Sequence, residues 1–241
     1  MTHPAMTPEA LAAFGRELDT IREKVIADLG VADVDYIRRV IKVQRGMEIA
    51  GRGLLMVPPA WPLGTALLAC SKILDNMEIG HNIMHGQYEW TGDPALNGRT
   101  FEWDTSCPAD QWRQSHNVVH HTYTNIVGMD RDIGYGILRM SPDQPWRPYF
   151  LGNPIYAFLL MVLFQYGVAL HEVEAERIRS GEMSLADKRQ VLEEIWRKTR
   201  RQTLKDYVAF PLLAGPFALL VFAGNMTANL VRNVWAFSII F

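Results

Sequence analysis

The first thirty residues alternate hydrophobic and polar positions with the period of a helix. Thr7 can cap that helix with its hydroxyl, Pro8 suits the first helical position, and Glu9 places an acid in the first turn. The apolar positions that follow are three or four residues apart and share one face: Leu11, Phe14, Leu18, Ile21 and Val25. The pattern predicts an amphipathic helix that either packs on protein or lies on a membrane surface.

Longer apolar runs follow, at 53–74, 155–170, 207–224 and 230–241. Prolines at 58, 59 and 62 predict a turn between two short spanning helices, because proline breaks a straight helix. The other runs reach or fall short of the roughly 20 residues that a bilayer core requires. Buried helices of a soluble protein would also give such runs. Four of them in one chain, with Tyr and Trp near their ends, favour an all-α integral membrane bundle.

Charge gives this bundle an orientation. Basic residues precede the first apolar run and fill the segment 173–206, and the positive-inside rule places both stretches in the cytoplasm. A hairpin that turns at the prolines then returns the chain to the cytoplasm, where it forms a histidine-rich helical cap. In this topology the run 155–170 does not cross the membrane but is interfacial or buried. A second hairpin is formed by the segments 207–224 and 230–241. We therefore expect an N-terminal amphipathic and basic region at 1–43, followed by one domain at 44–241.

Composition limits the partners and the cellular compartment that the chain is expected to have. The formal net charge of -2 gives no reason to expect nucleic acid as a partner. The two cysteines show no sign of forming a disulfide, which fits a reducing compartment. The N-terminal residues lack the basic and apolar regions of a secretory signal.

Five of the seven histidines lie in two short stretches, "GHNIMHG" and "WRQSHNVVHHTYTN". On a helix, His81 and His85 face the same way, as do His116 and His120, because they are four residues apart. His121 is about 100° round the helix from His120, so this trio is better suited to two neighbouring metal ions than to one. Neutral imidazole suits zinc, copper, iron or nickel. No thiolate is close by in the sequence, and the His-Glu-x-x-His motif of zinc proteases is missing.

Metal-bound histidines usually donate their second ring nitrogen to a carboxylate or carbonyl oxygen. The candidate partners are Glu78, one turn before His81, and Asp130 and Asp132 in "GMDRDIGYG". A solvated loop would explain the two aspartates equally well. His171 stands alone at the end of an apolar run, and we expect it to be interfacial or hydrogen-bonded.

The stretches "GHNIMHG" and "WRQSHNVVHHTYTNIVGMDRDIGYG" resemble the histidine boxes of the membrane fatty acid desaturases. "NMEIGHNIMHGQYEW", "KDYVAFP" and "LVRNVWAFSIIF" are similar to the bacterial acyl-CoA Δ9-desaturases of the mycobacterial type. The resemblance covers nearly the whole chain after about residue 35. It implies a di-iron site with the five clustered histidines as ligands, and dioxygen as co-substrate.

The resemblance also implies partners and a location. Electrons would come from an NAD(P)H-dependent reductase or a ferredoxin-type donor. The substrate would be a fatty acyl-CoA or an acyl lipid, held in a bent tunnel and converted to a cis alkene. The location would be the bacterial cytoplasmic membrane, with the histidines on the cytoplasmic side.

The sequence departs from the family in one respect. The family carries a third box, His/Gln-x-x-His-His, and a further histidine after the last spanning segment, whereas this chain ends at "FSIIF". We therefore expect the 241 residues to be the N-terminal part of a desaturase. Two alternatives stay open: another histidine-box di-iron hydroxylase, and an inactive desaturase fragment.

Overall fold

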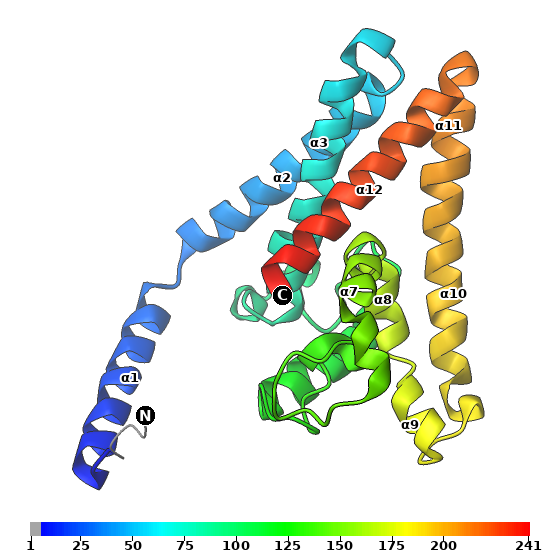
Figure 1. The fold of residues 1–241 in the computed structure, drawn as a ribbon. Coiled ribbons are helices and arrows are strands. Elements are labelled where there is room, and N and C mark those ends of the chain that lie inside the picture. The colour runs from blue at the N-terminus through cyan, green and yellow to red at the C-terminus, as the bar shows by residue number, and fades with distance from the viewer. Residues whose placement is uncertain (1–5) are drawn as a thin grey trace. The chain divides into compact units, whose positions relative to one another are not determined.

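The computed structural model describes residues 6–241 (Figure 1). Helices account for 77% of the chain, and no strand occurs between residues 6 and 241, so the predicted all-α class is confirmed. The chain forms two compact units, residues 1–39 and residues 40–241.

The first unit contains α1 (Pro8–Asp28) and the beginning of α2 (Val31–Leu54). The hydroxyl of Thr7 accepts a hydrogen bond from the amide of Ala10 (3.2 Å), so α1 begins where the sequence predicts. No residue of α1 is buried, and the predicted apolar face is exposed along the whole helix.

The second unit opens with a hairpin of α2 and α3 (Trp61–Ile73), joined by the short helix η1 (Pro58–Ala60). The turn predicted at the prolines is therefore confirmed. Gly51 and Gly64 let the two helices approach closely. A Cβ atom at Gly51 would lie 2.8 Å from the amide nitrogen of Leu68, and one at Gly64 would lie 2.7 Å from that of Leu55.

A second hairpin closes the unit, but not where we expected it to turn. One arm consists of α10 (Arg189–Leu204), η9 (Lys205–Ala209) and α11 (Phe210–Leu213), the turn is η10 (Gly215–Phe217), and the other arm is α12 (Ala218–Ile240). The prediction of a turn between 224 and 230 was wrong, because α12 is continuous there. The polar residues Asn225 and Asn229, which interrupt the apolar run in the sequence, are buried in the helix packing.

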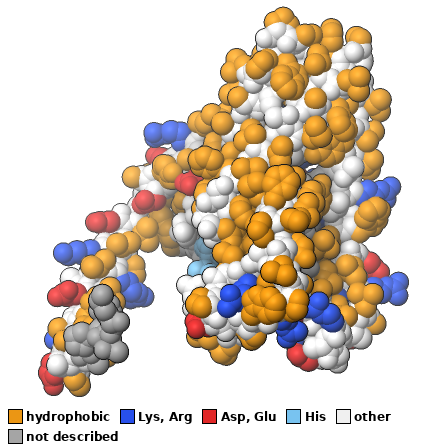
Figure 2. All heavy atoms as spheres, viewed as in Figure 1, with side chains coloured by type: hydrophobic (Ala, Val, Ile, Leu, Met, Phe, Trp, Pro, Cys, Tyr) orange, Lys and Arg blue, Asp and Glu red, His pale blue; other side chains and the backbone are white. Residues whose placement is uncertain are grey.

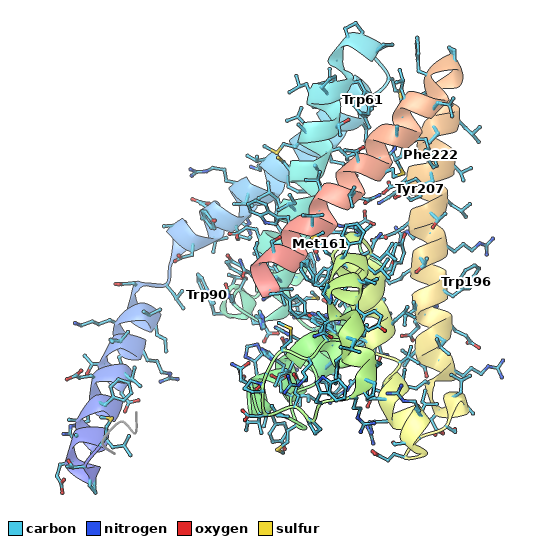
Figure 3. All side chains as sticks on the ribbon, viewed as in Figure 1. Trp61, Trp90, Met161, Trp196, Tyr207 and Phe222 are labelled. Carbon is cyan, nitrogen blue, oxygen red and sulfur yellow. The ribbon has the colours of Figure 1, made fainter. Side chains whose placement is uncertain are left out.

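Buried charges join the two hairpins. Asp206 contacts Arg52 (Oδ1 to Nη2, 3.2 Å) and Lys72 (Oδ2 to Nζ, 2.7 Å), and all three residues are buried. Asn225 and Asn229 of α12 hydrogen-bond to Arg52 and Asp206. Tyr207 and Phe222, labelled in Figure 3, have ring centroids 5.4 Å apart, and Asn229 also donates to the hydroxyl of Tyr207 (2.8 Å).

The segment between the hairpins carries the histidines on short helices. These are η2 (Leu74–Gly80), α4 (His81–Met84), η3 (Glu89–Thr91), η4 (Pro94–Leu96), α5 (Ala109–Trp112), η5 (Arg113–His120), α6 (His121–Tyr123), η6 (Ile133–Gly136), η7 (Pro148–Gly152), α7 (Asn153–Val162), α8 (Phe164–His171), α9 (Ala175–Ser180) and η8 (Leu185–Lys188). A hydrophobic core that includes Met84, Trp103, Trp112 and Phe164 supports this segment, and a separate core that includes Leu55, Leu68 and Val221 lies between the hairpins.

No single described helix combines the length and the apolar character needed to cross a membrane. One bent pair of helices meets both criteria together, by length and composition only. It consists of Pro148–Val162 and Phe164–His171, and the angle between the two helices is 103°. At this bend the side-chain amide of Asn233 donates a hydrogen bond to the carbonyl oxygen of Val162 (2.8 Å). Hydrophobic side chains gather over the end of the second unit that holds the two hairpin turns (Figure 2), and they include Leu63, Leu212, Leu213 and Leu219.

Candidate metal centre

The histidines lie where the chain leaves ordinary α-helical geometry. Residues 74–80 form the π-helix η2, directly before His81, and residues 113–120 form the π-helix η5, which contains His116 and His120. Wider π turns are rare and are frequently found at functional sites. α-Helical spacing correctly pairs His81 with His85 and His116 with His120, but it does not predict these wider turns.

All five clustered histidines come together. The Nε2 atoms of His81 and His85 are 2.8 Å apart. The ring of His116 lies 5.2 Å from that of His85 and 4.8 Å from that of His120, against which it stacks. His121 approaches the group from its exposed side, with its ring 4.9 Å from that of His85. Two helical segments about thirty residues apart thus direct five imidazoles at one small volume.

Two overlapping groups of potential ligand atoms result. His81, His85 and His116 form one, and His116, His120 and Asp132 form the other, with the ligand atoms of each group within 4.8 Å of one another. Among residues 6–241, neither group includes His121 or Glu78. Imidazole nitrogens at these separations suit zinc, copper, iron or nickel, so the residues fit the iron that the resemblance implies as well as the other three metals.

Asp132 and Asp130 contact the Nδ1 atoms of His116 and His120, respectively. Asp132 lies 2.8 Å from Nδ1 of His116 through Oδ2. Both carboxylate oxygens of Asp130 lie 3.0–3.1 Å from Nδ1 of His120. The backbone amides of Asn125 and Asp132 also donate to Asp130, which is buried. These contacts fix the ring orientations and leave each Nε2 free for a metal ion.

The surroundings keep several imidazoles neutral. Burial, together with the neighbouring histidines, lowers the pKa of both His81 and His85 to about 4. The same causes lower the pKa of His121. Burial alone would raise the pKa of Asp132, but the hydrogen bond to His116 contributes to holding it below its ordinary value. A neutral imidazole has a free lone pair, so near neutral pH this cluster is ready to bind a cation.

Three further contacts support the cluster, and the sequence did not reveal their partners. The ring of Trp112 stacks on His116 with centroids 4.4 Å apart, and its position one turn before that histidine was the available signal. His171, expected to be interfacial or hydrogen-bonded, is buried with Nε2 3.4 Å from Oδ1 of Asp132, a partner that the sequence did not indicate. Asn117 donates from its side chain to the carbonyl oxygen of Met84 (2.8 Å) and so ties the two histidine segments together.

A cavity of about 350 Å³ opens beside the histidines. His81, His116 and His120 line one part of it. Apolar and aromatic side chains line much of the rest, among them Met77, Trp103, Trp112, Phe164 and Val168. Such a cavity can hold an apolar ligand next to a metal ion.

The fold and the site define an all-helical protein with a histidine cluster that could hold a metal ion. The chain belongs to the fatty acid desaturase family, whose model matches residues 57–241. The resemblance stated from the histidine motifs is therefore confirmed. This family acts in lipid metabolism and is membrane-associated.

Known relatives agree with this assignment. The chain is 44% identical over 98% of its length to the NADPH-dependent stearoyl-CoA 9-desaturase of Mycobacterium tuberculosis, of which the alignment covers 57%. It is 32% identical over 65% of its length to the sn-1 linoleoyl-lipid 6-desaturase of Synechocystis, of which the alignment covers 47%. The chain thus spans about half the length of these relatives. No solved structure shows significant similarity to it.

Proposed function

We propose that this chain carries the first part of a di-iron site that desaturates a fatty acyl chain with dioxygen. One observation carries the proposal: five histidines from two segments meet beside an apolar cavity, and two aspartates orient two of them. The proposed ligands are His81, His85, His116, His120 and His121. Glu78, Asp130 and Asp132 are the proposed supporting carboxylates.

Imidazole donors are compatible with iron, and membership of the desaturase family favours iron over the other metals that imidazole binds. When bound, the two iron ions would supply the dioxygen chemistry that removes two hydrogens from neighbouring methylenes. The protein's own residues orient the histidines and shield the acyl chain from water. Asp130 and Asp132 hold the tautomers of His120 and His116, and the apolar walls of the cavity keep water from the acyl chain.

The proposed substrate is a fatty acyl-CoA or an acyl lipid, and the proposed electron donor is an NADPH-dependent reductase or a ferredoxin-type protein. The names of the relatives support both, since one acts on stearoyl-CoA with NADPH and another on a lipid-bound acyl chain. The exposed apolar side chains at the hairpin turns support insertion of that end into a membrane. We place the histidines on the cytoplasmic side of a bacterial inner membrane, from the basic residues of 38–45 and 173–206.

Product analysis tests this function. Membranes that contain the protein as its native gene encodes it are supplied with stearoyl-CoA, dioxygen, NADPH and a reductase, and the acyl products are separated by mass. An alkene is expected, an alcohol would instead indicate a hydroxylase, and no product despite bound iron would indicate an inactive desaturase relative.

Two ligand variants make the assignment specific. His120→Ala and His121→Ala should each abolish turnover, because each removes a proposed ligand. Asp143→Ala, in an exposed loop, is the control. Near-normal activity in either histidine variant would contradict the ligand assignment.

A further inference from the structure

A second cavity of about 470 Å³ lies next to the cavity at the histidines, and Tyr135 lines both. The second cavity is formed mainly by apolar and aromatic groups: Ile137, Tyr149, Tyr156, Leu170 and Ala175. Tyr135 is 8% exposed and lies within the core that supports the histidine segment. Its side chain therefore stands between two apolar spaces, only one of which reaches the proposed metal site.

The backbone at Tyr135 is unusual. Its φ of 52° lies in the left-handed region, which bulky residues rarely adopt. Gly134 and Gly136 on either side also have positive φ, 67° and 69°. Strain of this kind collects at functional sites and persists only where surrounding contacts maintain it. Here the ring of Tyr135 packs against those of His171 (4.8 Å) and Phe241 (5.5 Å).

The lining of the second cavity combines an apolar interior with one free cation. Arg179 lines it and is exposed, without a hydrogen bond or ion pair to any residue between 6 and 241. Glu176, which also lines the cavity, is held by Arg131 (3.0 Å). The neighbouring helix α7 exposes Ile155 and Phe158. This combination suits a molecule with an anionic head group and an apolar tail that arrives from a membrane.

We propose that the acyl substrate occupies both cavities, with its anionic head group at Arg179 and its chain passing Tyr135 to reach the histidines. Tyr135 is then a specificity-determining residue, because a chain reaches the metal site only when this side chain moves aside. The inference rests on the proposed function and names the entry route and the controlling residue, which the family assignment does not give. The head group is a phosphate-bearing one, from coenzyme A or from an anionic phospholipid.

Acyl-chain binding to the iron-free protein in lipid nanodiscs tests the inference without turnover. Octanoyl-CoA and stearoyl-CoA are compared in the wild type, Tyr135→Trp and Tyr135→Ala. Each methylene kept out of an apolar cavity lowers affinity about fourfold, since burying one is worth about 0.8 kcal/mol. We expect Tyr135→Trp to weaken stearoyl-CoA binding at least tenfold while octanoyl-CoA stays within about twofold. Tyr135→Ala should bind stearoyl-CoA at least as well as the wild type.

Tyr149→Ala is the matched control, because Tyr149 lines the second cavity but not the first. It should change the affinities for both chain lengths by the same factor. A photoreactive group at the end of the stearoyl chain should label the peptide 103–112 in the wild type and only peptides within 149–179 in Tyr135→Trp. Because these variants are compared as ratios, a general loss of folding does not imitate the result.

The outcomes separate the two proposals. If the wild type binds neither acyl-CoA nor the phosphatidylglycerol vesicles, the proposed function falls. If it binds both acyl-CoAs and the ratio of affinities is the same in all Tyr135 variants, the role of Tyr135 alone is overturned. Arg179→Ala should weaken either stearoyl-CoA or vesicles of distearoyl phosphatidylglycerol, and the affected ligand identifies the head group. No effect on either would overturn the assignment of the entry route.

Discussion

Asp130→Asn is the sharpest test of how the chain holds its histidines. The change keeps the size of the side chain and removes its charge. In the structure this carboxylate accepts from Nδ1 of His120 at 3.0–3.1 Å, from the amide of Asn125 at 2.8 Å and from that of Asp132 at 2.9 Å. An asparagine oxygen can accept only part of these bonds, and its NH₂ group would face a donor.

The magnitude follows from these contacts. Loss of a hydrogen bond to a charged group costs about 1.5–3 kcal/mol, and loss of the carboxylate partner of a metal-binding histidine typically lowers metal affinity by about 10–100-fold. We therefore expect Fe(II) to bind Asp130→Asn about 10–100-fold more weakly than the wild type. His120 would still be present as a ligand, but it would lose the carboxylate that fixes its tautomer.

Anaerobic Fe(II) titration by equilibrium dialysis measures the effect, and circular dichroism melting of the iron-free protein follows folding separately. Asp143→Asn is the control, since Asp143 is exposed and far from the histidines in sequence. If Asp130→Asn bound Fe(II) within twofold of the wild type while remaining folded, the proposed supporting role of this carboxylate would be refuted.

Three further changes test packing and charge. Asp206→Asn leaves Arg52 and Lys72 buried without their carboxylate, and chemical unfolding should show a loss of about 3–5 kcal/mol; a loss below 1 kcal/mol would contradict the buried network. Burial raises the pKa of Glu172 from 4.5 to about 7. Between these pH values the folded chain therefore retains a proton that the unfolded chain releases. The free energy of unfolding should fall by roughly 3 kcal/mol as pH rises from about 4.5 to above 7. Glu172→Gln should remove that dependence, and equal slopes in the two proteins would exclude Glu172 as its source. Gly51→Ala should separate α2 from α3, because its Cβ would lie 2.8 Å from a backbone nitrogen, and should lower the melting temperature, whereas Gly53→Ala, with open space at that position, should not.

Local sequence signals predicted the parts of the fold that depend on local physics. Thr7 and Pro8 predicted the start of α1, and the three prolines after Val57 predicted the first hairpin turn, because proline geometry acts over a few residues. The all-α class followed from apolar runs and helical spacing. The histidine pairs were also visible, since a four-residue interval brings side chains to one face in either kind of helix.

The missed features depend on long-range packing. Asn225 and Asn229 resembled a turn because their buried partners, Arg52 and Asp206, lie far away in the sequence. His171, at the end of α8, lies near Asp132 through tertiary packing of segments that are distant in the sequence. The left-handed conformation of Tyr135 was indicated in the sequence only by the glycines on either side of it. Such glycines also occur in ordinary turns, so they do not predict a strained residue that lines a cavity.

The most direct test of the central claim is the metal content of the protein purified from its native membrane under anaerobic conditions. We predict two iron ions per molecule of the protein as its native gene encodes it, lost in part or completely in His120→Ala, with spectroscopic evidence of nitrogen ligands. Zinc in place of iron, or iron content unchanged in His120→Ala, would contradict the assignment of these histidines to a di-iron desaturase site.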